Sequence, residues 1–208
     1  MTSSDLFLPK PTLTGSLVEL RPFNEQASSA MLDILCDPEV LIKTGSVHSQ
    51  QEAKAPYPRA AASQWYATRN VQRDRLDLAV FDLEEQAYVG EVVFNDYSAQ
   101  NKSVSYRIAL GERGRGRGFG TEATLLMIQY GFEILGLNRI ELEVYDFNKR
   151  ARYVYASCGF VTEGRRRQAL YCDGKYHDAL IKSILRADWE AAGRQGVLRA
   201  DSLAPVAL

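Results

Sequence analysis

Metal-binding and disulfide-forming side chains are scarce in this sequence. Its 208 residues include two histidines, His48 and His177, and three cysteines, Cys36, Cys158 and Cys172. No pair of cysteines has the C-x-x-C spacing of a metal site. A histidine-rich metal centre is therefore excluded, and no metal is expected. We interpret the cysteines as reduced, partly buried thiols of a cytoplasmic protein.

The sequence also lacks long apolar runs and an excess of charge of either sign. No stretch approaches the roughly 18 apolar residues that a membrane-spanning helix needs. The N-terminus lacks the basic and apolar regions of a signal peptide, so we expect a cytoplasmic protein with no membrane partner. With 25 Lys and Arg against 26 Asp and Glu, the net charge of −1 creates no overall field that attracts nucleic acid.

Length and composition predict a single globular domain. Hydrophobic residues make up 46% of the chain and charged residues 25%, which is ordinary for a soluble protein. We expect the domain to span residues 1–190. The Ala- and Gly-rich tail, residues 191–208, has little hydrophobic pattern and is expected to be poorly ordered.

Hydrophobic periodicity predicts a mixed α+β fold. Apolar and polar residues alternate over 17–23, as in a half-buried strand, and Asn24 is placed to cap a helix that reaches about Cys36. Prolines and Gly45 then indicate a long irregular region. The remaining predicted strands cover 77–82, 88–96, 102–110, 139–145, 160–171 and 176–186, and the remaining helices cover 59–70, 121–135 and 148–157.

A glycine-rich segment, residues 115–123 (RGRGFGTEA), follows a predicted strand directly and leads into the helix at 121–135. The first turn of a helix has free N–H groups and a partial positive charge, and glycine lets the backbone approach a phosphate closely. Three glycines alternate here: Gly116, Gly118 and Gly120. Because Arg115 and Arg117 are expected to add positive charge, the segment predicts a pyrophosphate-binding loop.

Other phosphate-binding loops fit this segment poorly. Its glycines do not have the G-x-G-x-x-G spacing of dinucleotide-binding folds, and no Gly-Lys-Ser/Thr of a P-loop is present. A basic RNA-binding segment of the RGG type is the remaining alternative. Such segments are usual in disordered sequence, whereas this one lies between a strand and an apolar helix.

Two spaced motifs resemble the GNAT superfamily of N-acetyltransferases. The first, Arg115-Gly-Arg-Gly-Phe-Gly120, matches the signature (Gln/Arg)-x-x-Gly-x-(Gly/Ala). The second, Asn148-x-x-Ala151-x-x-x-Tyr155-x-x-x-Gly159-Phe160, is similar to a segment that follows it in the family. The opening strand and the surroundings of the loop resemble the RimJ/RimL branch of ribosomal-protein N-terminal acetyltransferases. The resemblance spans about residues 11–189.

This resemblance implies a central mixed, mostly antiparallel sheet of six to seven strands, flanked by helices, whose two middle strands splay apart. Acetyl-CoA, the acyl donor, would enter the gap. Its pantetheine would pair with the strand that contains Ile108 and Leu110. The residues implied to hold its pyrophosphate are Arg115, Gly116, Arg117, Gly118, Phe119, Gly120 and Thr121.

Tyr155 occupies the position of the family's tyrosine, and the resemblance implies that it is the general acid. A phenol stays protonated at neutral pH and can give a proton to a departing thiolate. The alternative is a tyrosine that only packs its helix on the sheet. For Asn148 a hydrogen bond to pantetheine and a plain helix N-cap remain equal alternatives.

The general base is not assigned by the resemblance. Many relatives carry a glutamate where this chain has Ser103. Glu91, in the middle of a predicted strand, is our first substitute, followed by Asp96 and Glu143. For each of the three, a solvated position on a strand face is the alternative.

Two further features have simple interpretations. We assign Cys158 to packing, because no histidine lies near it in sequence to activate a nucleophile. The basic run at 165–167 is expected on a solvated strand or turn, with the 3′-phosphate of CoA or an acidic substrate as alternative partners.

The sequence therefore predicts an acetyl-CoA-dependent N-acetyltransferase. It would act on a primary amine, of a small molecule or of a peptide N-terminus, by direct transfer in a ternary complex. One alternative is a non-catalytic acyl-CoA-binding module of the same fold, and another is a basic-loop nucleic-acid binder. A homodimer is compatible with the resemblance, and the long segment 41–64 leaves the acceptor open.

Overall fold

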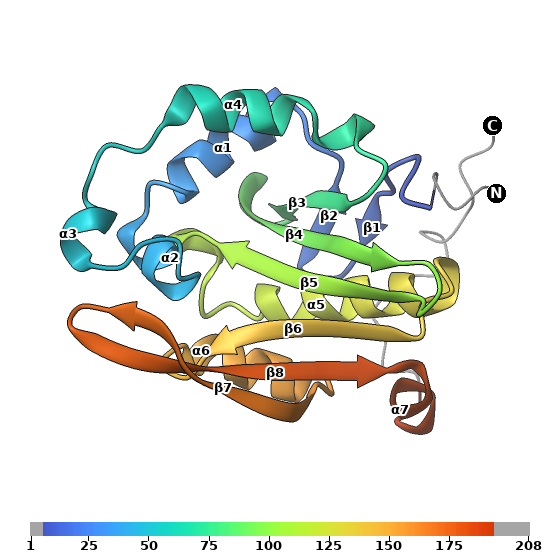
Figure 1. The fold of residues 1–208 in the computed structure, drawn as a ribbon. Coiled ribbons are helices and arrows are strands. Elements are labelled where there is room, and N and C mark those ends of the chain that lie inside the picture. The colour runs from blue at the N-terminus through green and yellow to red at the C-terminus, as the bar shows by residue number, and fades with distance from the viewer. Residues whose placement is uncertain (1–5, 194–208) are drawn as a thin grey trace.

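This computed structural model describes residues 6–193. They form one eight-stranded sheet with helices packed on it (Figure 1). The strand order is β1-β2-β3-β4-β5-β6-β8-β7. Every neighbouring pair is antiparallel except β5 and β6, which are parallel. The strands are β1 (Leu13–Thr14), β2 (Val18–Arg21), β3 (Leu76–Asp82), β4 (Ala87–Ser98), β5 (Ser103–Leu110), β6 (Arg139–Tyr145), β7 (Val161–Cys172) and β8 (Lys175–Leu185).

This architecture confirms the predicted α+β fold, and the short edge strand β1 raises the number of strands above the expected six to seven. Most of the expected tail, residues 194–208, lies outside the described residues. Within 6–193 no helix is both long and apolar enough to cross a membrane.

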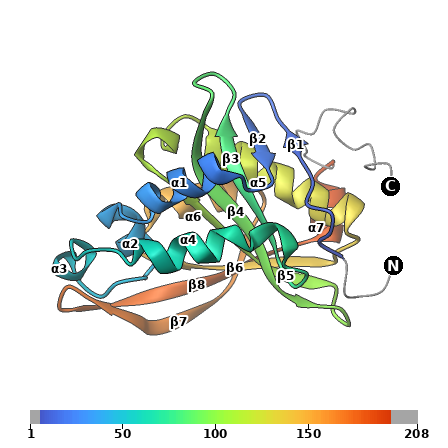
Figure 2. The same cartoon turned by 90° about the horizontal axis from the view of Figure 1, so that it is seen from above.

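Helices cover both faces of the sheet (Figure 2). α1 (Glu25–Ile34) and α4 (Arg59–Ala67) pack on one face, where Ala79 of β3 joins their core. α5 (Phe119–Gln129) and α6 (Lys149–Ser157) pack on the other face, in a larger core with residues of most strands. Successive side chains of a strand point to opposite faces of the sheet, so a strand can contribute apolar side chains to both cores.

Local signals explain where most helices begin. The side chain of Asn24 accepts a hydrogen bond from the amide of Ala27 (2.8 Å), which confirms the predicted N-cap of α1. The predicted helix at 121–135 continues beyond α5 as a π-helical turn, Tyr130–Ile134. The last helix of the described residues is α7 (Arg186–Ala191).

The region after Cys36 is more regular than expected. It forms two short helices, α2 (Pro38–Lys43) and α3 (Gln50–Ala53). Asp37 caps α2, and Pro38 occupies its first turn, where the missing N–H costs nothing. These helices are too short to show a periodic apolar face, which is why periodicity did not reveal them.

β5 and β6 part soon after they begin. Only Ser103 to Ser105 of β5 pair with β6, opposite Arg139 to Glu141. β5 continues to Leu110, while β6 turns toward β8 and pairs with it along its whole length. The second half of β5 therefore has a partner on the β4 side and none from β6.

Glu122 fixes the start of α5 against the opening hairpin. Its buried carboxylate accepts hydrogen bonds from the amides of Ser16 (2.9 Å), Leu17 (2.7 Å) and Val18 (2.8 Å). Hydrogen bonds to a charged acceptor are stronger than neutral ones. The carboxylate therefore holds the turn between β1 and β2 beside the first turn of α5.

We predict that Glu122→Gln lowers the free energy of unfolding by about 2–3 kcal/mol, since an amide NH₂ replaces one acceptor and faces N–H donors. Urea denaturation followed by circular dichroism measures this. Glu133→Gln is the matched control. Glu133 is exposed in the π-helical turn that follows α5, so this change should alter stability little. Equal midpoints for the two variants would contradict this role for Glu122.

Candidate active site

A cleft of about 640 Å³ opens where β5 and β6 part. Four segments line it: α2, the end of β5, the glycine-rich loop and α6. Of the predicted donor-binding residues, it brings together Ile108, Leu110, Arg115, Gly116, Gly118, Gly120, Thr121 and Asn148. Arg117 and Phe119 do not line it. The sequence thus located most of this cleft, and α2 is the wall that it missed.

The start of α5 borders the cleft and has no side-chain cap. Gly118 is the N-cap of α5, with a φ of 82°, and no side chain caps the first turn. A side chain at Gly118 would be strained by this left-handed conformation. The amide of Thr121 is already bonded to the carbonyl oxygen of Gly118 (3.1 Å), so Thr121 contributes less to an amide cradle than expected.

The expectation that Arg115 adds free positive charge needs correction. Its guanidinium donates to the carboxylates of Asp37 (2.6 Å) and Glu39 (2.6 Å), and its Nε donates to the carbonyl oxygen of Leu110 (3.1 Å). Arg115 thus ties the glycine-rich loop to α2 and to the end of β5. Its charge is balanced by protein carboxylates.

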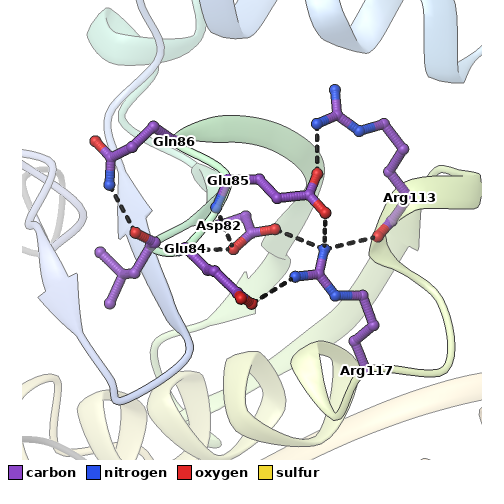
Figure 3. A network of polar contacts seen from close by, with 7 residues as sticks. Asp82, Glu84, Glu85, Gln86, Arg113 and Arg117 are labelled. Atoms are coloured by element: carbon purple, nitrogen blue, oxygen red, sulfur yellow. Dashed lines mark hydrogen bonds and ion pairs between the residues drawn. The ribbon is translucent and has the colours of Figure 1, made fainter.

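Arg117 needs the same correction. Its guanidinium donates to Asp82 (2.7 Å), Glu85 (2.9 Å) and Glu84 (3.1 Å) in the turn between β3 and β4 (Figure 3). Asp82 is fully buried and also accepts the amides of Glu84 and Glu85. The arginine therefore neutralises a buried carboxylate on the side of the loop away from the cleft.

The mouth of the cleft receives its positive charge from residues outside the glycine motif. Lys43 of α2 and Lys149 and Arg150 of α6 line it, and Arg150 pairs with Glu39 (3.4 Å), which also lines it. Asp37-Pro38, a helix-start signal, could have revealed α2 from the sequence. What the sequence could not show is that α2 lies against the loop.

Tyr155 lines the cleft from α6 and is 6% exposed. Burial raises the pKa of its phenol, so the group is protonated at neutral pH. Its ring also packs edge-on against Tyr106 and Phe160, with centroids 6.3 Å and 5.7 Å away. The packing role is therefore present, and the position suits a proton donor as well.

Asn148 has the expected N-cap role, and its contact with pantetheine stays a prediction. It lines the cleft and its side chain caps α6, accepting from the amide of Ala151 (3.2 Å). Its amide nitrogen donates to the carbonyl oxygen of Lys43 (3.4 Å). The residue therefore joins α6 to α2 across the cleft.

Glu91 lies on β4 directly opposite Ala109, which lines the cleft from β5. Its carboxylate accepts a hydrogen bond from the hydroxyl of Tyr66 on α4 (3.1 Å). Burial, and next the repulsion from Asp77, raise the pKa of Glu91 to about 7. A carboxyl group with this pKa can accept a proton near neutral pH.

Glu91 does not itself line the cleft, and the other two candidate bases lie farther from Ala109. Asp96 lies in the irregular part of β4, exposed, and accepts from the side chain of Asn95 (2.8 Å). Glu143 is paired with Arg166. Neither lines the cleft, and Ser103 lies at the start of β5, where β6 is still paired.

Comparison with known proteins identifies the family. A model of the acetyltransferase (GNAT) domain matches residues 18–161, more than half of the chain. The chain belongs to the GNAT acetyltransferase family. It is 25% identical over 179 residues to the SPbeta prophage-derived uncharacterized N-acetyltransferase YokL of Bacillus subtilis (strain 168), an alignment that covers 85% of this chain and 94% of that protein.

Two further similarities concern spermidine acetyltransferases of Vibrio cholerae. Spermidine N(1)-acetyltransferase is 29% identical over 101 residues, which are 49% of this chain and 58% of that protein. The crystal structure of spermidine N-acetyltransferase in complex with CoA and spermine superposes with a TM-score of 0.73 at 20% identity, covering 84% of this chain and 98% of that one. The second likeness shows the GNAT fold.

The surroundings of Cys158 do not suit a nucleophile. Cys158 is buried, its thiol contacts the carbonyl oxygen of Thr121 (3.7 Å), and burial raises the pKa of the thiol to about 12. A thiol with that pKa forms almost no thiolate at neutral pH. Within residues 6–193 no group of three or more His, Cys, Asp or Glu is placed to hold a metal ion.

The basic run at 165–167 lies on the exposed edge strand β7, away from the GNAT cleft. Arg165 pairs with Asp178 (3.2 Å), and Arg166 pairs with Glu143. These contacts match the expected solvated strand.

We predict that Arg117→Met lowers the free energy of unfolding more than Arg113→Met does, because Asp82 stays buried without its counter-ion. Arg113→Met is the matched control, since Arg113 pairs with the same turn through Glu85 and is mostly exposed. Its change should stay below about 1 kcal/mol. Chemical denaturation compares the two, and a similar loss in both would contradict the special role of the buried pair.

Proposed function

We propose that this GNAT chain transfers the acetyl group of acetyl-CoA to a primary amine by direct attack in a ternary complex. The observation that carries the proposal is the cleft between the parted strands, which ends on the uncapped start of α5. Ile108 and Leu110 border it from the half of β5 that lacks a β6 partner. The unpaired backbone groups of this half-strand can form hydrogen bonds with an extended pantetheine, and the amides at the start of α5 can bind a pyrophosphate.

The paired arginines support the backbone as the main contact to the pyrophosphate. Arg115 and Arg117 are occupied by carboxylates, so the loop offers amide groups and the helix dipole. The same pairing argues against the nucleic-acid alternative, which needs free basic side chains to contact phosphates.

In the proposed reaction the nitrogen of a neutral amine attacks the thioester carbon, and the carbon–sulfur bond breaks. Glu91 accepts the proton that the amine loses, directly or through water. Tyr155 donates a proton to the departing thiolate. The two groups lie on opposite sides of β5, because Glu91 faces the α1 and α4 side while Tyr155 belongs to the α5 and α6 side.

The acceptor remains within the class of primary amines, of small molecules or of peptide N-termini. The motifs favour the RimJ/RimL branch, and the spermidine acetyltransferases share the fold. We place the protein in the cytoplasm as one domain over residues 1–190, with a homodimer as the compatible assembly. The non-catalytic alternative predicts CoA binding without turnover.

The pH dependence of kcat/KM tests Glu91. Wild-type activity should rise with a midpoint near 7, as the carboxyl ionises. The hydrogen bond from Tyr66 lowers the pKa of Glu91, so Tyr66→Phe should move the midpoint to higher pH. Tyr88→Phe, on the same strand, is the matched control and should leave it unchanged. Glu91→Gln should remove this step, and an unchanged profile in Glu91→Gln would contradict the assignment.

Tyr155→Phe tests the general acid. We expect kcat to fall about 100-fold with an unchanged affinity for CoA, because the ring remains and only the proton donor is lost. Release of the CoA thiol measures kcat, and calorimetry measures the affinity. Tyr106→Phe, the same change in the adjacent ring, should retain nearly full kcat. A Tyr155→Phe variant as active as that control would show that Tyr155 only packs.

A further inference from the structure

A second groove, of about 430 Å³, lies between α6 and the closing hairpin of β7 and β8. From α6 it is lined by Lys149, Arg152, Tyr153 and Ala156, from β7 by Thr162, and from β8 by Leu180 and Lys182. Three of these seven side chains carry a positive charge. None of the residues that line it is acidic.

The two sites use different sides of the same helix. Residues 149, 152, 153 and 156 are spaced as i, i+3, i+4 and i+7 and line the second groove. Ala151, Val154 and Tyr155 line the cleft proposed for the donor. Lys149 and Tyr153 border both, so the two hollows adjoin along one edge of α6.

Lys182 is the unusual residue of this groove. It is only 6% exposed, and its ammonium donates to the hydroxyl of Thr162 (2.8 Å). Within residues 6–193 no ion pair involves Lys182. Burial lowers its pKa, and repulsion from Arg152 lowers it further. A buried ammonium without a counter-ion is costly, which indicates that a negative group belongs beside it.

The strand pattern and existing pairs explain why no nearby carboxylate serves. Lys182 pairs with Leu142 on β6 and with Thr162 on β7, so these side chains share its face. Glu143 and Glu163 belong to the other face of the sheet, where they bind Arg166 and Arg139. Asp178 shares the face of Lys182 along β8, but it does not line the groove and accepts from Arg165 (3.2 Å) and from the amide of Gln168 (2.7 Å).

Among residues 6–193, Arg152 is held in place by a main-chain contact and has no ion pair. Its guanidinium donates to the main-chain carbonyl oxygen of Asp146 (2.9 Å). A guanidinium has five N–H donors, so most of them are left for another acceptor. Lys149 adds a third cation at the open side of the groove.

We propose that this groove binds a phosphate group of a ligand other than the acetyl donor, with Lys182 at the floor and Arg152 and Lys149 at the sides. Three cations match the double charge of a phosphate better than the single charge of a carboxylate. Inorganic phosphate and small phosphate monoesters are the class of ligand that fits. The proposal does not depend on the transferase activity.

Calorimetric titration with inorganic phosphate, at constant ionic strength set by chloride and with saturating CoA present, tests this. We expect saturable binding to the wild type. Lys182→Met keeps the buried stem and removes the charge, and it should weaken binding about tenfold or more, since a charge-assisted hydrogen bond is lost. Arg152→Gln, an exposed change on α6, should weaken binding in the same direction.

Lys175→Met is the matched control, because Lys175 is an exposed lysine at the turn end of β8 and outside the groove. It should bind phosphate like the wild type. Absence of phosphate binding to the wild type would overturn the proposal, as would equal affinity in the Arg152→Gln and control variants. Binding that is seen only without CoA would assign the groove to the donor and overturn the separate site.

Discussion

The structure depends on the early separation of β5 from β6. Three residues of each strand pair, and beyond them β5 has a partner on one side only, whereas β6 stays paired with β8 along its whole length. A strand with unpaired N–H and C=O groups is costly unless a ligand or water satisfies them. The cleft, the loop at its end and α6 on its far wall are all placed around this unpaired stretch.

The glycine-rich loop is held by charged side chains that are bound to protein partners on several sides. Glu122 ties the start of α5 to the turn between β1 and β2, Arg117 ties the loop to Asp82, and Arg115 ties it to α2. These contacts leave the amides of the first turn as the groups that face the cleft. A donor site built from backbone is compatible with a loop whose arginines are already paired, and this explains the glycines and the arginines together.

The sequence predicted those features that depend on neighbouring residues. Asn24 as an N-cap and the strand at 139–145 are local, and the structure confirms them. The partners of the two arginines were not predictable, because Asp37 is 78 positions from Arg115 and Asp82 is 35 from Arg117. A pattern of residues shows that a charge is present, whereas only the fold shows what neutralises it.

Calorimetric binding of acetyl-CoA to the wild type, Gly118→Asp and Gly136→Asp tests the central claim most directly. Both glycines have a positive φ, so the two variants carry a similar backbone strain, and Gly136 lies at the other end of α5 and its π-helical turn. We predict that the wild type and Gly136→Asp bind the donor and that Gly118→Asp does not, because a side chain and a negative charge then occupy the anion site. Equal binding by a folded Gly118→Asp variant, or no binding by the wild type, would contradict the account.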